Sequence, residues 1–466
     1  MPVSSILSVL LAATALAASP GPTETSGPVA ASAEAVPALR CERFDLANGL
    51  QVLLHHDARV PLVAVNLWYH VGAKNEVPGR SGFAHLFEHI MFQGSRNVAE
   101  DTFFTRLEQA GAPLVNGTTD FDRTNYFETV PSNQLELALW LESDRMGFLL
   151  DTLSQERLDN QRGVVRKERQ QSTENVPYGV AEEQFFKALF PAPHPYNGVV
   201  IGSHADLEAA TLEDVRGFFT TFYAPNNATL AIVGDYDPAT IRGLVERYFG
   251  SLPRGAAPPA LQVPPAKVEK EARLTLTDEV ELPKVYLGWI TPRAFEPGDA
   301  ELELAAGVLS GDTAARLDDA LVRKAQIAQS VSAYQYSLQL GSVFAVEILG
   351  APGQDPAALE AAAWAEIERL RATPPTPAEM ERARTAWEAS KLRGLERLGG
   401  FGGKADVLNA YNHLVGDPEF LAKDVARMRA VTAEGLQTVV AAQLRADNRV
   451  VVHVTPAKKA AAGGAK

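Results

Sequence analysis

The residues of this chain best suited to do chemistry are two histidines and a glutamate that stand close together. His85, Glu88 and His89 form a His-x-x-Glu-His pattern in an apolar stretch, and Ser81 or Gly82 is placed to begin a helix there. On such a helix both histidines project from one face, one turn apart, where their ring nitrogens can bind one Zn²⁺ at about 2.0–2.1 Å. The pattern therefore predicts a zinc site on a helix, with Glu88 beside it.

A zinc site of this kind is suited to hydrolysis. The ion lowers the pKa of a bound water towards about 7, and the Glu88 carboxylate can take the proton and later deliver it to a leaving amine. About 0.02 matches to the pattern are expected by chance in a chain of this composition. The alternative interpretation, two core or surface histidines at helical spacing, is therefore the weaker one.

Residues on both sides of this pattern follow the consensus of a known family. Near the expected helix they are Val71-Gly72-Ala73, Glu76, Gly79, Gly82 and Gly94. Further along they are Asn116, Thr118, Asp122, Thr124, Tyr126, His194-Pro195-Tyr196, Ile201-Gly202-Ser203, Ala224 to Asn227 and Gly234-Asp235. Together they resemble the pitrilysin and mitochondrial-processing-peptidase family of zinc peptidases, the inverzincins, whose motif reverses the zincin order. The resemblance covers nearly the whole chain after its apolar N-terminus.

The resemblance implies a third metal ligand on another helix. In the family this ligand is the Glu that closes a Glu/Gln-Arg-x-x-Val-x-x-Glu pattern, which the segment from Gln161 to Glu168 matches, so we expect Glu168 to be the ligand. Some relatives have Glu at the position of Gln161, where it is proposed to support the metal site, and here that charge is missing. The competing candidates for the third ligand are Glu174, Glu182 and Glu183.

The resemblance also implies an activity, against which two other functions must be weighed. We expect a zinc-dependent endopeptidase with one Zn²⁺ per chain, which cleaves unfolded peptides or small proteins inside a chamber. An edge strand that contains Asn116 is expected to bind extended substrate through backbone hydrogen bonds. The alternative is a non-catalytic structural or assembly subunit, which is the role of relatives that lack the metal. The intact motif argues against this alternative. A zinc-dependent binding module would need a fourth protein ligand.

The elements that must position these residues are repeated along the chain. A helical pattern followed by an apolar run begins at Thr211 and again at Thr432, 221 residues later. The same offset separates Trp68 from Trp289, each in a run rich in Val and Leu. Strands and amphipathic helices alternate without the short βα rhythm of a parallel sheet. We therefore expect an α+β fold of two homologous halves, each a mainly antiparallel sheet with helices packed on it.

The repeat divides the chain into two domains. Residues 40–252 are expected to form the metal-binding peptidase domain, and residues 273–456 a homologous domain. The segment 253–272 is rich in Pro, Ala and Gly and is read as the linker. The second domain lacks metal ligands, because the positions 221 residues after the motif are Ala306, Leu309 and Ser310.

The second half also departs from the family. In relatives an Arg and a Tyr of this half grip the peptide backbone, but Val322 and Gln329 occupy those positions here. We therefore expect a heterodimer in which a paralogue supplies this clamp. If Arg323 replaces the missing Arg by a shift of one residue, a homodimer would suffice.

The termini and the charge bear on location and partners. Residues 1–17 are read as a signal peptide, with Ala15-Leu16-Ala17 as the cleavage site, and residues 18–39 as a flexible tether. We expect an exported, periplasmic protein with no transmembrane segment in the mature chain and a disordered tail at 457–466. The formal charge of −14 argues against binding to nucleic acid. A single cysteine, Cys41, excludes an intrachain disulfide.

Overall fold

The computed structural model describes residues 38–261, 263 and 266–457. The expected signal peptide at 1–17, nearly all of the tether and nearly all of the tail lie outside the described residues. Within the part that is described, no helix is both long enough and apolar enough to span a bilayer.

The first half is built on a six-stranded sheet in the order β1-β2-β6-β3-β5-β4. Its strands are β1 (Glu42–Asp45), β2 (Gln51–His56), β3 (Leu62–Tyr69), β4 (Leu114–Thr119), β5 (Thr124–Pro131) and β6 (Ala228–Gly234). Only β2 and β6 pair in parallel, and the other pairs are antiparallel. Its helices are α1 (Phe83–Ile90), α2 (Thr102–Gln109), α3 (Leu135–Phe148), α4 (Gln155–Arg169), α5 (Gly179–Leu189), α6 (His204–Ala209), α7 (Leu212–Phe222) and α8 (Ile241–Phe249). Among the described residues, β4 is an edge strand of this sheet.

The second half has a five-stranded sheet in the order β7-β11-β8-β10-β9. Its strands are β7 (Ala272–Asp278), β8 (Lys284–Thr291), β9 (Ala328–Tyr336), β10 (Ser342–Gly350) and β11 (Val450–Pro456). Its helices are α9 (Asp299–Leu309), α10 (Pro356–Ala372), α11 (Pro377–Gly394), α12 (Lys404–Val415), α13 (Leu421–Ala430) and α14 (Ala433–Gln443). Only β7 and β11 pair in parallel. The predicted α+β class with two mainly antiparallel sheets is confirmed.

The pairing pattern repeats between the halves. In the first sheet β3 lies between β5 and β6, and in the second β8 lies between β10 and β11. The helix α7 leads into β6 as α14 leads into β11, and Thr211 and Thr432 cap these two helices through their side chains. The repeat makes the edge strand β9 the counterpart of β4. The domain boundaries at 252 and 273 stay predictions.

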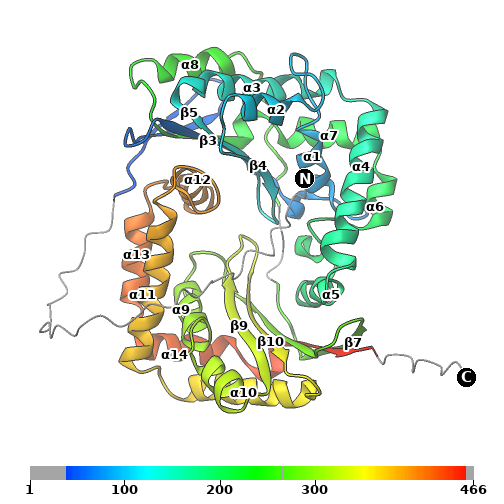
Figure 1. Ribbon diagram of the computed structural model, residues 1–466, viewed down its shortest axis with the longest axis vertical. Helices are drawn as coiled ribbons and strands as arrows, with labels where there is room; N and C mark the ends of the chain where they lie inside the picture. The colour runs from blue at the N-terminus through cyan, green and yellow to red at the C-terminus, as the bar shows by residue number, and fades with distance from the viewer. Residues whose placement is uncertain (1–37, 262, 264–265, 458–466) are drawn as a thin grey trace, which may run out of the picture.

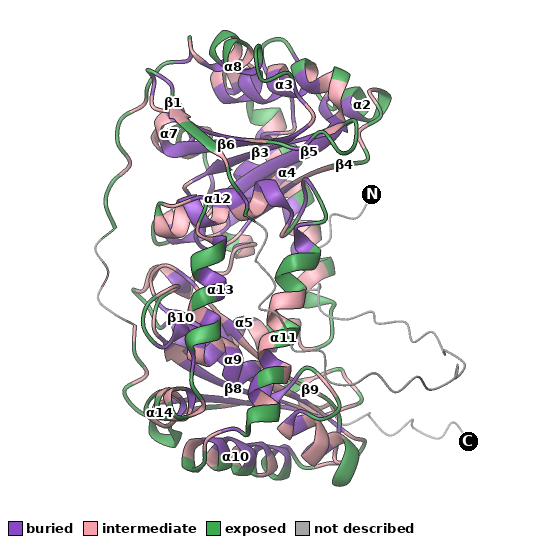
Figure 2. Ribbon diagram, turned by 90° about the vertical axis from the view of Figure 1, so that its left-hand side faces the viewer, coloured by how far each residue is buried: buried purple, intermediate pink, exposed green. Residues whose placement is uncertain are grey.

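One helix of each half packs on the sheet of the other half, as Figures 1 and 2 show. The helix α12 packs against β3 and β6 of the first sheet, where Asn409 Nδ2 donates to the carbonyl of Asn66 at 2.9 Å. In return α5 packs on β8 and β11, and the Phe185 and Tyr286 rings lie 5.3 Å apart. Gly288 permits this approach, because a Cβ there would lie 2.3 Å from Phe185. The exchange fixes the position of one half against the other.

Candidate metal centre

The predicted helix around the motif is present as α1, and its first turn is held by a side chain from outside the helix. Gly82 precedes α1 with φ of +86° and has no side chain with which to cap it. The Glu76 carboxylate supplies the cap instead, accepting from Gly82 N at 3.0 Å and from Ala84 N at 2.8 Å. The loop that carries Glu76 is itself bound to the turn between β4 and β5, since Ala73 N donates to Asp120 O at 3.0 Å. Glu76 therefore links the helix of the motif to the edge strand.

The helix α4 brings the expected third ligand to α1. Leu158, Gln161 and Val165 form its buried face at spacings of three and four residues, and Glu168 continues this face at the next step. The helix begins at Ser154, whose side chain accepts from Arg157 N. At its far end Arg169 is buried and donates to Gly202 O at 2.7 Å and to Glu183 at 2.7 Å. These bonds fix the last turn, which carries Glu168.

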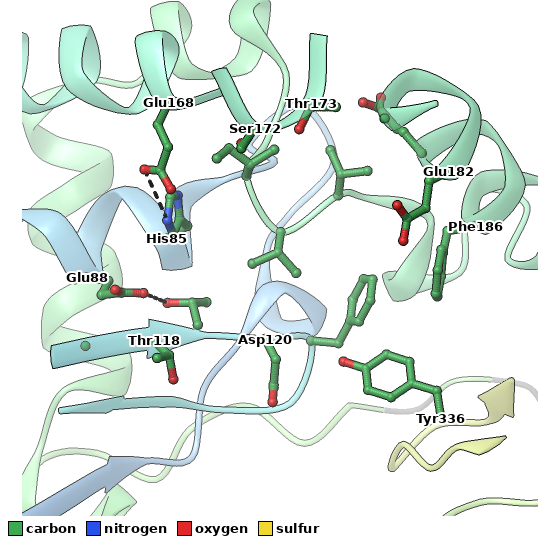
Figure 3. A pocket seen from close by; sticks show the side chains of 18 residues that line it. His85, Glu88, Thr118, Asp120, Glu168, Ser172, Thr173, Glu182, Phe186 and Tyr336 are labelled. Atoms are coloured by element: carbon green, nitrogen blue, oxygen red, sulfur yellow. Dashed lines mark hydrogen bonds and ion pairs between the residues drawn. The ribbon is translucent and has the colours of Figure 1, made fainter. Parts of the chain in front are cut away.

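The structure brings His85, His89 and Glu168 together. Their candidate ligand atoms all lie within 4.8 Å of one another. The Oε2 atom of Glu168 is 3.2 Å from His89 Nε2 and 3.8 Å from His85 Nε2. Two ligands at about 2.0–2.1 Å from a tetrahedral ion lie roughly 3.3 Å apart, so this spacing suits Zn²⁺. Figure 3 shows Glu168 directed at His85 across the pocket.

The polar atoms of the three side chains also fit a cation. His89 Nε2 and Glu168 Oε2, which face each other at 3.2 Å, are buried and have no hydrogen-bond partner. Buried polar atoms rarely remain without a partner, and two imidazoles with one carboxylate are a common set of zinc ligands. Burial, reinforced by His89, lowers the pKa of His85 to about 4, which keeps this imidazole in the neutral form that binds metal. The residues present therefore fit zinc.

Glu88 lies between the three-residue cluster and the edge strand. It is 4% exposed, and its Oε2 accepts a hydrogen bond of 2.7 Å from Thr119 Oγ1 on β4. A Cβ on Gly117 would lie 3.2 Å from Glu88 Oε1, so the strand passes directly over the carboxylate. Burial raises the pKa of Glu88 to about 7, while His89 and Thr119 lower it. A carboxyl group of this pKa can both accept and return a proton near neutral pH.

The other candidates from the sequence take different places. Burial lowers the pKa of His89, but the Glu168 and Glu88 carboxylates raise it overall, and the buried Gln161 side chain makes a smaller contribution in the same direction. Asn116 lies on β4, and its Oδ1 accepts from Gly117 N at 3.0 Å. Of the competing third ligands, Glu174 and Glu183 both accept from Arg169. Neither these two nor Glu182 belongs to the cluster that the described residues form around His85 and His89.

A cavity of about 190 Å³ opens beside this cluster (Figure 3). Its lining comes mainly from β4, α5 and the loop before α6, and it includes one residue of the second half, Tyr336 on β9. No sequence pattern predicted the place of Tyr336 or the anchoring role of Arg169, since both depend on contacts between distant segments. Arg323, the suggested clamp residue, does not line the cavity: its side chain is 57% exposed and donates to Thr313 O at 3.0 Å.

Comparisons with known proteins agree on one family. A model described as insulinase, peptidase family M16, matches residues 51–193, and one described as the peptidase M16 inactive domain matches residues 209–386. The chain is similar to "Zinc protease PqqE" of Helicobacter pylori, with 30% identity over 360 residues that cover 76% of this chain and 80% of the relative. It is also 24% identical over 301 residues to "Uncharacterized zinc protease YmxG" of Bacillus subtilis, covering 64% and 71% of the two chains.

Solved structures share the fold. The crystal structure of a protease from Helicobacter pylori matches with a TM-score of 0.83 and 27% identity, covering 90% of this chain and all of that one. The periplasmic protease PqqL from Escherichia coli matches with a TM-score of 0.73 and 17% identity. That match covers 90% of this chain but 48% of PqqL, so the chain spans about half the length of that protein.

Proposed function

The chain belongs to the M16 family of peptidases, and we propose that it is a zinc-dependent endopeptidase acting on unfolded peptides or small proteins. In this proposal His85, His89 and Glu168 bind one Zn²⁺, and Glu88 is the general acid and base. The observation that carries it is the convergence of His85 Nε2, His89 Nε2 and Glu168 Oε2 beside the Glu88 carboxylate at an edge of the first sheet, where the atoms of His89 and Glu168 are buried without hydrogen-bond partners.

The metal ligands, Glu88 and the edge strand β4 would each have a separate role in the reaction. When bound, zinc supplies a Lewis acid that polarises a carbonyl group and activates water. Glu88 accepts the proton of the attacking water and returns it to the leaving nitrogen, and Thr119 holds its carboxylate in place. The edge of β4 that does not pair with β5 offers backbone groups to an extended peptide. Such bonds do not depend on the substrate sequence, so one strand can receive many peptides.

Partner and location are further parts of the proposal. Val322 and Gln329 stand at the clamp positions, and Arg323 does not reach the cavity, so we propose that a paralogous partner supplies the Arg and the Tyr. The half-length match to PqqL is consistent with an enzyme built from two such chains. A homodimer remains the second arrangement. The apolar segment at 1–17 supports export, as does the structural similarity to the periplasmic protease PqqL.

A non-catalytic assembly subunit is the competing function. Its support is that residues 209–386 match a model described as an inactive domain. That match lies outside the segment with the motif, because all of His85, Glu88, His89 and Glu168 fall within the insulinase match at 51–193. The complete ligand set therefore favours the peptidase.

The deciding experiment combines zinc content with cleavage of a quenched unfolded peptide. The wild type, Glu88→Gln and the exposed control Glu213→Gln are each measured alone and mixed with a paralogue. Stoichiometric zinc with cleavage that only Glu88→Gln abolishes supports the peptidase, and cleavage only in the mixture supports the partner. Absence of zinc, or cleavage that survives Glu88→Gln, leaves the assembly subunit.

A further inference from the structure

A glycine-rich loop of the second half lies against the first sheet. Residues 399–403, Gly-Gly-Phe-Gly-Gly, lead from α11 into α12, and they belong neither to the metal centre nor to the cavity beside it. The Phe401 ring meets the Phe127 ring of β5 edge to face, with centroids 5.4 Å apart. On the neighbouring edge strand, Leu114 Cδ2 lies only 3.0 Å from where a Cβ on Gly400 would be. The loop therefore brings an aromatic side chain of the second half to β4.

The glycines give this loop its shape. A Cβ on Gly399 would lie 2.7 Å from a threonine hydroxyl of β5, so only glycine lets the loop approach the sheet this closely. Gly400 and Gly402 flank Phe401 with φ of +76° and +66°, a backbone conformation that residues with side chains rarely adopt. The carbonyl of Phe401 accepts from Arg397 Nη2 at 2.6 Å. The loop therefore holds Phe401 in a defined position.

Phe401 and Leu114 form an apolar patch on the surface. Phe401 is 43% exposed and Leu114 38%, whereas most large apolar side chains of the described residues are buried. Single exposed apolar side chains are normal in folded proteins. Two that come from different halves and lie together at an edge strand indicate a surface that a ligand covers.

The alternation of side chains along β4 relates this patch to the catalytic carboxylate. Leu114 and Asn116 lie on the face of the sheet that the loop covers, and Gly117 lies on the other face, over Glu88. Strand residues rise about 3.3 Å each, so Leu114 lies roughly 10 Å from Gly117 along β4. An extended peptide paired with β4 would alternate in the same way. The residue opposite Gly117 would face Glu88, and its neighbours would face the loop.

We propose that Phe401 and Leu114 form a subsite for a large apolar side chain of the peptide substrate. This side chain lies one or three residues from the residue opposite Gly117. The inference rests on the proposed peptidase function, and it adds a specificity determinant that the half without metal ligands supplies. A peptide aligned on β4 covers the patch with its own side chain, and this burial removes apolar surface of both partners from water. An aromatic side chain also gains the contact between two rings.

The same contacts disfavour polar side chains at that position. A charged side chain would lose hydration beside Phe401 and Leu114 without gaining a partner from either of them. A leucine would still bury apolar area, so it should bind nearly as well as a phenylalanine. The preference should therefore follow the apolar area of the substrate side chain and depend on Phe401.

The test scans an unfolded peptide with blocked ends and a single cleavage site. Each position within three residues of the cleaved bond carries Phe, Leu, Ser or Asp in turn. We would measure kcat/KM for the zinc-loaded wild type, Phe401→Ser, Phe401→Leu and Val60→Ser, a control at another exposed apolar residue. In the wild type and Val60→Ser, Phe should be favoured over Ser about tenfold at a position on one side of the bond. In Phe401→Ser this ratio should fall below about twofold with unchanged zinc content, and Phe401→Leu should keep most of it.

Binding provides a second readout that does not need catalysis. The dissociation constants of the Phe and Ser peptides are compared for Glu88→Gln and for the double variant Glu88→Gln, Phe401→Ser. Tighter binding of the Phe peptide that disappears in the double variant supports the inference. Equal binding of both peptides to Glu88→Gln, or a preference that persists without Phe401, overturns it. A binding preference in the absence of any cleavage by the wild type would count against the peptidase and not against the subsite.

A second copy of this chain is the competing occupant of the patch. Sedimentation of the wild type and Phe401→Ser at the assay concentration separates the two occupants. An unchanged oligomeric state together with a lost preference for Phe supports the subsite. A wild-type dimer that dissociates in Phe401→Ser without any change in peptide preference would assign the patch to an interface between copies and overturn the subsite. Leu114→Ser is the independent variant, and a ratio of Phe to Ser cleavage that it leaves unchanged would also overturn it.

Discussion

Thr119 on the edge strand β4 donates a hydrogen bond of 2.7 Å to the Glu88 carboxylate on α1. This bond joins the strand that would align a peptide to the group that would exchange its proton. It orients one carboxylate oxygen and leaves the other directed towards the space under Gly117.

Replacing Thr119 with Val should remove this orientation while keeping the shape of the side chain. We expect kcat to fall by about tenfold, because a carboxylate that rotates spends less time in hydrogen-bond reach of the water. Zinc content should not change, since Thr119 touches no ligand. Thr119→Ser is the matched control and should keep most of the rate. Unchanged kinetics in Thr119→Val would show that the bond has no part in catalysis.

Glu168→Gln should lose zinc. The substitution keeps the size of the side chain but removes the charge that faces His85 and His89. After dialysis against buffer without metal, the wild type should retain about one zinc per chain and the variant much less. Glu182→Gln is the control, because Glu182 lies outside the cluster. A full complement of zinc in Glu168→Gln would exclude Glu168 as a ligand.

Removal of the metal should lower the thermal stability. An ion that binds only the folded chain stabilises it by about 4 kcal/mol at a free concentration 1,000 times the dissociation constant. A chelator should therefore lower the Tm of the wild type, and added zinc should restore it. The same chelator should have no effect on a variant with His85 and His89 both changed to Gln. A shift of equal size in that variant would point to a different metal site.

Glu76→Ala should destabilise the first turn of α1. The substitution leaves the Gly82 and Ala84 amides without their acceptor, and the loss of a helix cap costs about 1 kcal/mol in the free energy of unfolding. Urea denaturation of the zinc-free protein measures this cost apart from metal binding. Glu76→Gln keeps an acceptor oxygen and should lose less. Equal stability of all three proteins would mean that the amides find other partners.

Acid should weaken the contact between the halves. His70 of the first half and His413 of α12 have ring centroids 4.7 Å apart, and His413 Nε2 lies 2.9 Å from Gln339 Nε2. Burial, helped by Lys74, lowers the pKa of His70 to about 4, and burial, helped by His70 and Lys74, lowers the pKa of His413 well below its usual value. The unfolded chain therefore binds these protons at higher pH than the folded chain does. Stability present above pH 6.5 should be lost as the pH falls towards 4.

The measurement for this pair is the free energy of unfolding at several pH values between 7.5 and about 4.5. His413→Gln should flatten the dependence on pH in that range. His56→Gln should leave it unchanged, because the His56 side chain is exposed. An equal slope in the wild type and His413→Gln would assign the acid sensitivity to other groups.

Local patterns in the sequence predicted the parts of the site that one element carries. The spacing of His85, Glu88 and His89 puts all three on α1, because helical geometry depends only on neighbouring residues. The offset of 221 residues predicted two similar halves, because a repeated pattern of helix and strand forms the same unit twice. The resemblance supplied Glu168, which lies on a second helix and has no local link to α1.

Only the tertiary structure decided which distant residues meet. The exchange of α5 and α12 between the halves depends on the complementary surfaces of Phe185, Gly288 and Asn66, and no periodicity records such a match. The same exchange brings Glu182 and Tyr336 to one cavity and His70 against His413. Short spacings therefore predicted the chemistry of the motif, whereas the shape and charge of the cavity beside it arise from packing between separate segments, as distant in the chain as Phe121 and Tyr336.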